Sequence, residues 1–152
     1  MSDDKNNSGF SADEQRLLAS VLDEIIPSGD GKLPAAGQLG VASYIDEALQ
    51  NTPDLKSMIV QGLADLDNAA RRRNAQGFAA LPREDKLQLL NEQAFVLPLT
   101  FHAYVGYYQH ARVIEALGLE PRPPHPKGYQ MEPNDLTLLD AVRRRPKRYR
   151  EC

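Results

Sequence analysis

The stretch SADEQRLLASVLDEIIP, residues 11–27, decides the fold class, because it combines a helix start signal with a helical apolar repeat. Ser11 and Glu14 have the spacing of a capping box, in which each side chain accepts a hydrogen bond from the other residue's backbone N–H. Apolar residues then recur every three or four positions until Pro27 ends the pattern. They are Leu17, Leu18, Val21, Leu22, Ile25 and Ile26. The stretch predicts an amphipathic helix.

Further helices are predicted wherever the same periodicity returns. Pro53 is typical of the first position of a helix, and that helix should run to about Asn74. Pro98 removes a backbone donor from a helix over 94–110, so we expect a break near Leu97. Shorter helices are expected over about 41–50, 82–93, 113–117 and 138–142. Strand-like alternation is missing, so we predict an all-α, single-domain helical bundle of about five to seven helices.

Two segments do not fit the helical repeat. Residues 27–40 contain four glycines and two prolines, which favours a structured loop. Residues 120–129 contain four prolines, which favours a proline-rich extended segment close to polyproline II. The expected organisation is a disordered N-terminus over 1–10, a helical domain over 11–142 and a basic C-terminal tail over 143–152.

The charges are divided unequally between the body and the tail. Residues 1–142 carry 12 Lys and Arg against 20 Asp and Glu, a net charge of −8, whereas residues 143–152 carry 6 against 1, a net charge of +5. Such a tail can contact nucleic acid, a membrane, an acidic partner or its own domain. The acidic body would repel a polyanion, and no helix-turn-helix or aromatic stacking platform is evident, so no nucleic acid is expected. Nucleic-acid binding through the basic tail remains an alternative.

The compartment is predicted from signals that the sequence does not contain. No run approaches the roughly 18 apolar residues that would span a membrane. The first ten residues, MSDDKNNSGF, have no basic n-region, apolar h-region or twin arginine. Cys152 is the only cysteine, which excludes an intramolecular disulfide framework and a cysteine-built metal site. We expect a cytoplasmic protein with no direct membrane span.

Motifs for catalysis, cofactor binding and metal binding are absent from the sequence. It contains no GxGxxG, GxxxxGK[ST], GxSxG or HExxH pattern. Its three histidines are not spaced as a helical metal pair. The acidic groups Asp23-Glu24, Asp46-Glu47 and Asp65-x-Asp67 lie on predicted polar helix faces and are expected to be solvated. We therefore expect no catalytic residues, no cofactor and no metal site in this chain.

One stretch, residues 101–129, has a composition that favours a docking surface. It combines five aromatic residues with the proline-rich segment, and tyrosine and arginine are enriched at the centres of protein interfaces. The alternative is that the tyrosines complete the core and leave their hydroxyl groups at its edge. The predicted partner contacts are Tyr107, Tyr108, His125, Tyr129 and Arg148.

A second alternative assigns the same stretch to a stand-alone protein. Tyr108, His110 and Glu115 are ionisable groups that could carry out acid–base chemistry on a small molecule. A concave pocket that joins them would support this hypothesis.

Three stretches in order resemble the gluconate 2-dehydrogenase subunit 3 family. They are LLASVLDEIIPSGDGKLPAAGQLGVASYIDEAL over 17–49, GLADLDNAARRRNAQGFAALPREDKLQLL over 62–90 and TFHAYVGYYQHARVIEALGLEPRPPHPKGY over 100–129. The most distinctive pieces are Ile25-Ile26-Pro27 before a Gly/Ala-rich loop, Gly77-Phe78-x-x-Leu81, and Gly106-Tyr107-Tyr108 followed by Gly128-Tyr129. Members of this family are small subunits of flavin-dependent sugar and polyol dehydrogenases.

The resemblance implies a non-catalytic accessory subunit that binds a large FAD-containing subunit of the glucose–methanol–choline (GMC) type and stabilises or matures it. FAD is then expected in the partner, together with the catalytic residues, and a cytochrome c subunit is a further partner in the family. Many members begin with a twin-arginine signal, which this sequence lacks. The complex could therefore work in the cytoplasm, or reach the periplasm if its partner carries the signal, or this chain could have another use.

Overall fold

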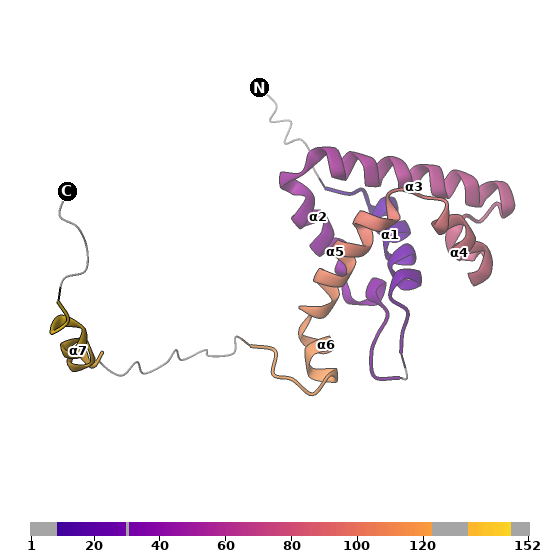
Figure 1. Cartoon of the computed structure of the whole chain (residues 1–152). Coiled ribbons are helices and arrows are strands. Elements are labelled where there is room, and N and C mark those ends of the chain that lie inside the picture. Colours follow the sequence, from indigo (N-terminus) through magenta and orange to yellow (C-terminus); the bar gives the residue numbers. More distant parts are fainter. Residues whose placement is uncertain (1–8, 30, 123–133, 147–152) are drawn as a thin grey trace, which may run out of the picture. The chain divides into compact units, whose positions relative to one another are not determined.

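The computed structural model describes residues 9–29, 31–122 and 134–146 (Figure 1). These residues form seven α-helices and four short 3₁₀ helices, with a single isolated bridge between Gly29 and Leu33 and no strand. The predicted all-α class is confirmed. The chain divides into two compact units, residues 1–121 and 122–152. Each unit is described by itself.

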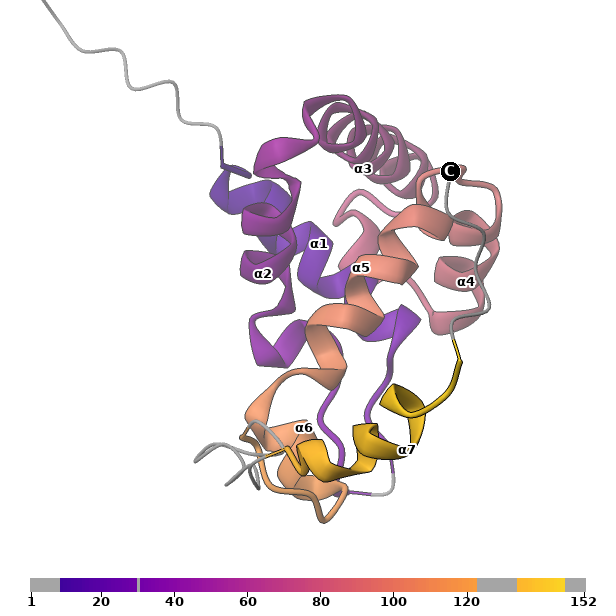
Figure 2. The same ribbon diagram turned by 60° about the vertical axis from the view of Figure 1, so that its left-hand side comes forward.

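The first unit contains six α-helices around one hydrophobic core. Helix α1 contacts α2, α3, α4 and α5, and Figure 2 shows α5 running across it. The capping box at its start is confirmed, since the Ser11 N–H donates to Glu14 at 2.7 Å and the Glu14 N–H donates to the Ser11 hydroxyl at 3.3 Å. The α-helices are α1 Ala12–Ile25, α2 Val41–Ala48, α3 Pro53–Arg73, α4 Arg83–Asn91, α5 Val96–Tyr108 and α6 Ala111–Ala116.

Short 3₁₀ helices occupy the connections, and the second unit contains the last helix. In the first unit they are η1 Ala36–Leu39, η2 Leu49–Asn51 and η3 Phe78–Ala80. The described part of the second unit consists of η4 Leu136–Leu139 followed directly by α7 Asp140–Arg143.

The expected break at Leu97 is wrong in position. Helix α5 begins at Val96, so Pro98 stands in its first turn and the helix continues unbroken to Tyr108. The first four N–H groups of a helix have no partner within it, so a proline there removes no hydrogen bond. The interruption that we expected inside the helix is instead the turn between α4 and α5.

Asp46 does not lie on a solvated helix face, as we expected, but links three segments. It accepts hydrogen bonds from the Phe10 backbone N–H at 3.1 Å and from the Lys56 ammonium at 2.6 Å. Its side chain is 18% exposed and that of Lys56 15%. Phe10 itself is buried in the core, although we expected disorder through residue 10. A charge-assisted pair with little exposure fixes the geometry of both partners.

The acidic pair near the end of α1 is also structural rather than solvated. Glu24 forms an ion pair with Lys86 of α4 at 3.1 Å, and the side chains are 12% and 15% exposed. Asp23 accepts a hydrogen bond from the Gly37 backbone N–H at 2.8 Å and so holds η1 against α1. These carboxylates, which we predicted to be solvated, connect elements that are separated along the chain.

Candidate partner interface on helix α5

Helix α5 is apolar on two opposite sides, and only one of them faces the core. Its inner side is buried through Leu99, Ala103, Gly106 and Tyr107. The other side carries four large side chains with spacings of four, three and four residues, which places them along one helix face. We call them the α5 outer face: Leu97, 80% exposed; Phe101, 67%; Tyr104, 45%; and Tyr108, 52%.

The inner side fixes how far α5 can rotate. A Cβ at Gly106 would lie 2.5 Å from the Tyr44 ring, so glycine allows α5 to approach α2 closely. The Tyr107 hydroxyl donates a hydrogen bond to the Pro34 carbonyl at 2.9 Å, which ties the 27–40 loop to the helix. Burial, with a smaller contribution from Tyr108, raises the pKa of Tyr107. These contacts determine which residues point outward.

Aromatic rings on the α5 outer face support one another. Tyr104 and Tyr108 stack with ring centroids 6.0 Å apart and an interplanar angle of 5°. Tyr107 meets Tyr108 edge to face at 5.2 Å, so the buried ring supports the exposed one. Such ring pairs lie in the range where aromatic contacts are favourable. The rings are held in place before any partner arrives.

No charged residue interrupts this helix, because the sequence of α5 is VLPLTFHAYVGYY. A helix that is hydrophobic all round normally lies inside a protein. Contiguous apolar surface that remains in water marks an interaction site. Leu117 and Leu119, which follow α6, are also exposed at 49% and 63%. The α5 outer face has the character of a protein interface.

The two predicted contact residues on α5 differ in their exposure to solvent. Tyr108 lies on the α5 outer face, but Tyr107 is only 1% exposed and cannot contact a partner in this conformation. It is adjacent to Tyr108 in sequence and therefore lies about 100° around the helix from it. The other predicted contacts lie outside the described residues and stay predictions: His125, Tyr129 and Arg148.

Sequence reasoning missed three members of the α5 outer face. Leu97, Phe101 and Tyr104 were not among the predicted contacts, although their spacing and the absence of charge from the helix could have identified them. The spacing alone leaves open which side of an all-apolar helix is buried. Only the tertiary contacts of Gly106 and Tyr107 decide it.

His110 has a structural role that accounts for its position. Its Nδ1 accepts a hydrogen bond from the Arg112 backbone N–H at 3.3 Å, and it is the N-cap of α6. It thus does for α6 what Ser or Asp does at other helix starts. This contact gives no support to the alternative in which His110 works with Tyr108 and Glu115 in acid–base chemistry.

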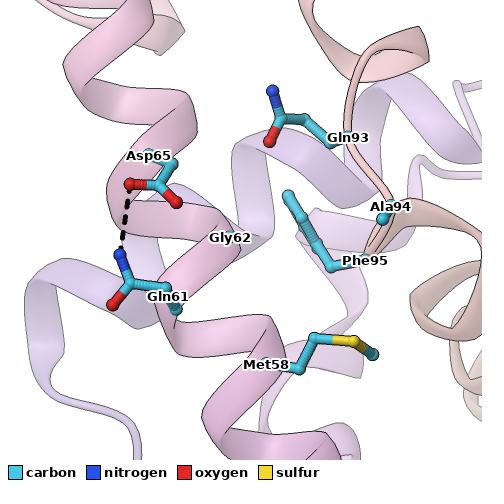
Figure 3. Close-up of a pocket in the computed structure, with 7 residues that line it drawn as sticks. All are labelled: Met58, Gln61, Gly62, Asp65, Gln93, Ala94 and Phe95. Carbon is cyan, nitrogen blue, oxygen red and sulfur yellow. Dashed lines mark hydrogen bonds between the residues drawn. The ribbon is translucent and has the colours of Figure 1, made fainter.

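Two shallow pockets lie elsewhere on the first unit. One, of about 250 Å³, separates α3 from the turn before α5 and is shown in Figure 3, where Gln61 donates to Asp65 at 3.1 Å. The other, of about 280 Å³, lies between α1, α3 and η3 and contains the ion pair of Arg71 with Asp67. Neither pocket is lined by Tyr108, His110 or Glu115.

The described residues contain neither a metal-binding cluster nor a membrane-spanning helix. No group of three or more His, Cys, Asp or Glu side chains there could hold a metal ion. None of the helices in the same residues has the length and apolar content needed to cross a bilayer.

In the described residues, the fold and surface together define a small all-α protein with one hydrophobic core, in which helix α5 exposes an apolar face. A sequence profile described as Gluconate 2-dehydrogenase subunit 3 matches residues 12–95, more than half of the chain. The chain therefore belongs to the gluconate 2-dehydrogenase subunit 3 family, which confirms the predicted family. The third of the three similar stretches, residues 100–129, lies outside the match. The match includes α1 to α4 and ends just before α5. Searches against curated proteins and solved structures returned no match.

Proposed function

We propose that this chain is the non-catalytic accessory subunit of an FAD-dependent dehydrogenase of the GMC type that acts on a sugar or polyol. The α5 outer face binds the large flavoprotein subunit, and FAD and the catalytic residues belong to that subunit. Membership of a family of small dehydrogenase subunits supports this assignment. The single observation that carries it is the row of exposed apolar side chains on α5.

Burial of this row supplies a driving force for association. A side chain of this size contributes about 1.5–3 kcal/mol when it moves from water to full burial, and less when it is already half covered. Aromatic side chains at the centre of an interface are the usual hot spots. An obligate complex buries more than about 2,000 Å², so surfaces beside α5, including Leu117 and Leu119, also belong to the contact.

Binding of this kind stabilises the partner by mass action, because the accessory subunit binds only the folded flavoprotein. That linkage is the physical basis for a role in stabilising or maturing the large subunit. The complex works in the cytoplasm, or in the periplasm where an export signal carries both subunits there together. A cytochrome c subunit then completes the electron path.

Co-production of the tagged chain with a large GMC-type flavoprotein from the same genome tests the proposal. The wild-type chain should retain that protein together with a flavin absorbance spectrum. Phe101→Asp and Tyr108→Asp should each weaken binding at least about 30-fold, because loss of a hot spot costs about 2 kcal/mol or more. Leu87→Asp on α4 is the matched control, because Leu87 is also a large apolar side chain that is exposed, at 39%, but lies outside the α5 outer face.

Circular dichroism of each purified variant establishes that it remains folded. Folded Asp variants that bind the flavoprotein as tightly as wild type would remove α5 from the interface. A wild-type chain that binds no flavoprotein would overturn the accessory-subunit assignment itself.

A further inference from the structure

We infer that η4 and α7 form a second docking element, which binds as a short helix in an apolar groove with an acidic rim on the large subunit. This inference rests on the proposed function, because it takes the same protein as partner. It concerns a different part of the chain, in the second compact unit. We call residues 134–146 the C-terminal docking segment.

The first observation is that this segment exposes every large apolar side chain it has. Neither η4 nor α7 contains a buried residue. Leu138 and Leu139 lie four and three positions before Val142, so the three share one side of the helix. The exposed fractions are 60% for Leu136, 75% for Leu138, 44% for Leu139 and 55% for Val142.

The second observation is that local contacts specify a helix that is too short to be stable alone. Asp135 accepts hydrogen bonds from the backbone N–H of Thr137 at 3.0 Å and from its hydroxyl at 2.6 Å, and these bonds lower the pKa of Asp135. Arg143 forms an ion pair with Asp140 at 3.6 Å. Isolated helices shorter than about 12–15 residues are marginal in water. A helix with a specified start and no core needs a surface on which to pack.

The positive charges at the end of this segment indicate which kind of partner surface it would bind. Arg143, Arg144 and Arg145 follow one another at the end of the helix, and the sequence continues with Lys147, Arg148 and Arg150. An acidic rim at one end of a groove would meet these cations, and apolar anchors three and four residues apart are the signature of a helix bound in a groove. The anchors and the cations thus require two adjacent features of one partner surface.

A lipid surface fits the same segment less well. Helices that lie in an anionic membrane interface carry Lys and Arg along their polar face. The polar residues within η4 and α7 are Thr137, Asp140 and Arg143, and Asp135 precedes η4 as its N-cap, so Arg143 is the single cation within the two helices. The arginines gather beyond the last apolar anchor instead of flanking the apolar side. A protein groove accommodates this arrangement.

Two docking elements on one chain increase affinity through their connection. Once α5 is bound, the C-terminal docking segment searches only a small volume, and a second contact of this type raises overall affinity about 10²- to 10⁴-fold when both can bind together. The extended segment that we predict over 120–129 lies mostly outside the described residues and stays a prediction. The segment would then slow dissociation of the complex.

The test measures binding of the full-length chain to the separately purified flavoprotein. The double variant Leu138→Ser and Val142→Ser should weaken binding about 10²-fold or more. Leu87→Ser on α4 is the matched control and should bind as wild type. Changing Arg143, Arg144 and Arg145 to Gln should weaken binding and flatten its salt dependence, whereas changing all three to Lys keeps the charge and most of the affinity.

The outcomes separate this inference from the proposed function. Wild-type binding that both the Ser variant and the Gln variant retain in full would overturn the second docking element and leave the α5 interface intact. Failure of the wild-type chain to bind the flavoprotein would overturn both. Capture of the wild-type chain, but not the Ser variant, by vesicles of phosphatidylcholine and phosphatidylserine would replace the protein groove with a lipid surface. A lower melting temperature of the isolated Ser variant would show instead that the segment packs on its own chain.

Discussion

Helices α3 and α5 pack into the same core but differ in what they present to the outside. Helix α3 is amphipathic: it buries Ile59, Leu63, Leu66 and Ala70, and polar side chains occupy most of its other positions. Helix α5 buries an equivalent row and presents a second apolar row in place of polar side chains. Water solvates the polar outer side of α3, whereas the outer side of α5 leaves large apolar side chains exposed among the residues that the structure describes. One helix can therefore pack into the core on one side and expose large apolar side chains on the other.

The largest effect is expected on the inner side of α3. Leu63→Ala should reduce the free energy of unfolding by about 2–5 kcal/mol, because Leu63 is fully buried and its truncation leaves a cavity. Urea unfolding followed by circular dichroism measures the change. Met58→Ala on the same helix is the control, because Met58 is 42% exposed, and it should cost less than about 0.5 kcal/mol. Equal losses at both positions would contradict the division of α3 into two sides.

A glycine on each helix gives the next comparison. A Cβ at Gly62 of α3 would lie 2.1 Å from Phe95, a ring that is 2% exposed, whereas a Cβ at Gly106 of α5 would lie 2.5 Å from the less deeply buried Tyr44. Alanine gains about 1 kcal/mol of helix propensity at either position. Overpacking costs about 1–3 kcal/mol where the neighbour cannot move. We expect Gly62→Ala to destabilise the fold and Gly106→Ala to be closer to neutral.

Unfolding of the two alanine variants in urea measures this difference. A Gly106→Ala variant that is less stable than Gly62→Ala would show that α5 is held more rigidly against α2 than α3 is held against Phe95. The comparison thus measures how rigidly the inner side of α5 packs against α2.

A smaller effect is expected where α5 meets the 27–40 loop. Tyr107→Phe removes the hydrogen bond to the Pro34 carbonyl and should cost about 1 kcal/mol. Because the pKa of Tyr107 is raised above its usual value of about 10, the folded state keeps this proton at a pH where the unfolded state loses it. Stability from this group is therefore present below pH 10 and falls as the pH rises further.

Urea unfolding of wild type and Tyr107→Phe at pH 8 and above pH 10 measures both parts of this prediction. The difference between the two proteins should narrow at the higher pH, since phenylalanine has no proton to lose. Tyr108→Phe is the matched control because Tyr108 is 52% exposed. A constant difference across this range would mean that burial does not perturb the Tyr107 hydroxyl.

The sequence predicts those parts of the fold that depend on local signals. The capping box of Ser11 and Glu14 and the proline at the start of α3 each act within one helical turn, so both were predicted correctly. The position of Pro98 relative to the start of α5 was misjudged, because that start depends on how the preceding turn packs. A proline disrupts a helix or is tolerated in it depending on where the helix begins, and the local sequence around Pro98 does not determine that residue.

The candidate interface was harder to predict because it depends on contacts across the chain. Asp46 binds the Phe10 backbone 36 residues away, and Glu24 pairs with Lys86 62 residues away. Helical periodicity alone therefore placed these carboxylates in solvent. The same limit applies to two adjacent tyrosines, since composition assigned Tyr107 and Tyr108 to one surface. A rotation of about 100° separates them, and only the hydrogen bond to Pro34 shows which one is inside.

The smallest effect on stability is expected on the α5 outer face. Phe101→Ser should change the free energy of unfolding by less than about 0.5 kcal/mol, because the ring is 67% exposed and leaves no cavity. Leu99→Ser, two positions earlier and fully buried, should be strongly destabilising. If urea unfolding gives Phe101→Ser a large loss, the ring already supports the isolated fold. A stable variant that no longer binds the flavoprotein would instead show that the exposed apolar row on α5 binds the partner, whereas the polar side chains of α3 keep its outer side in contact with water.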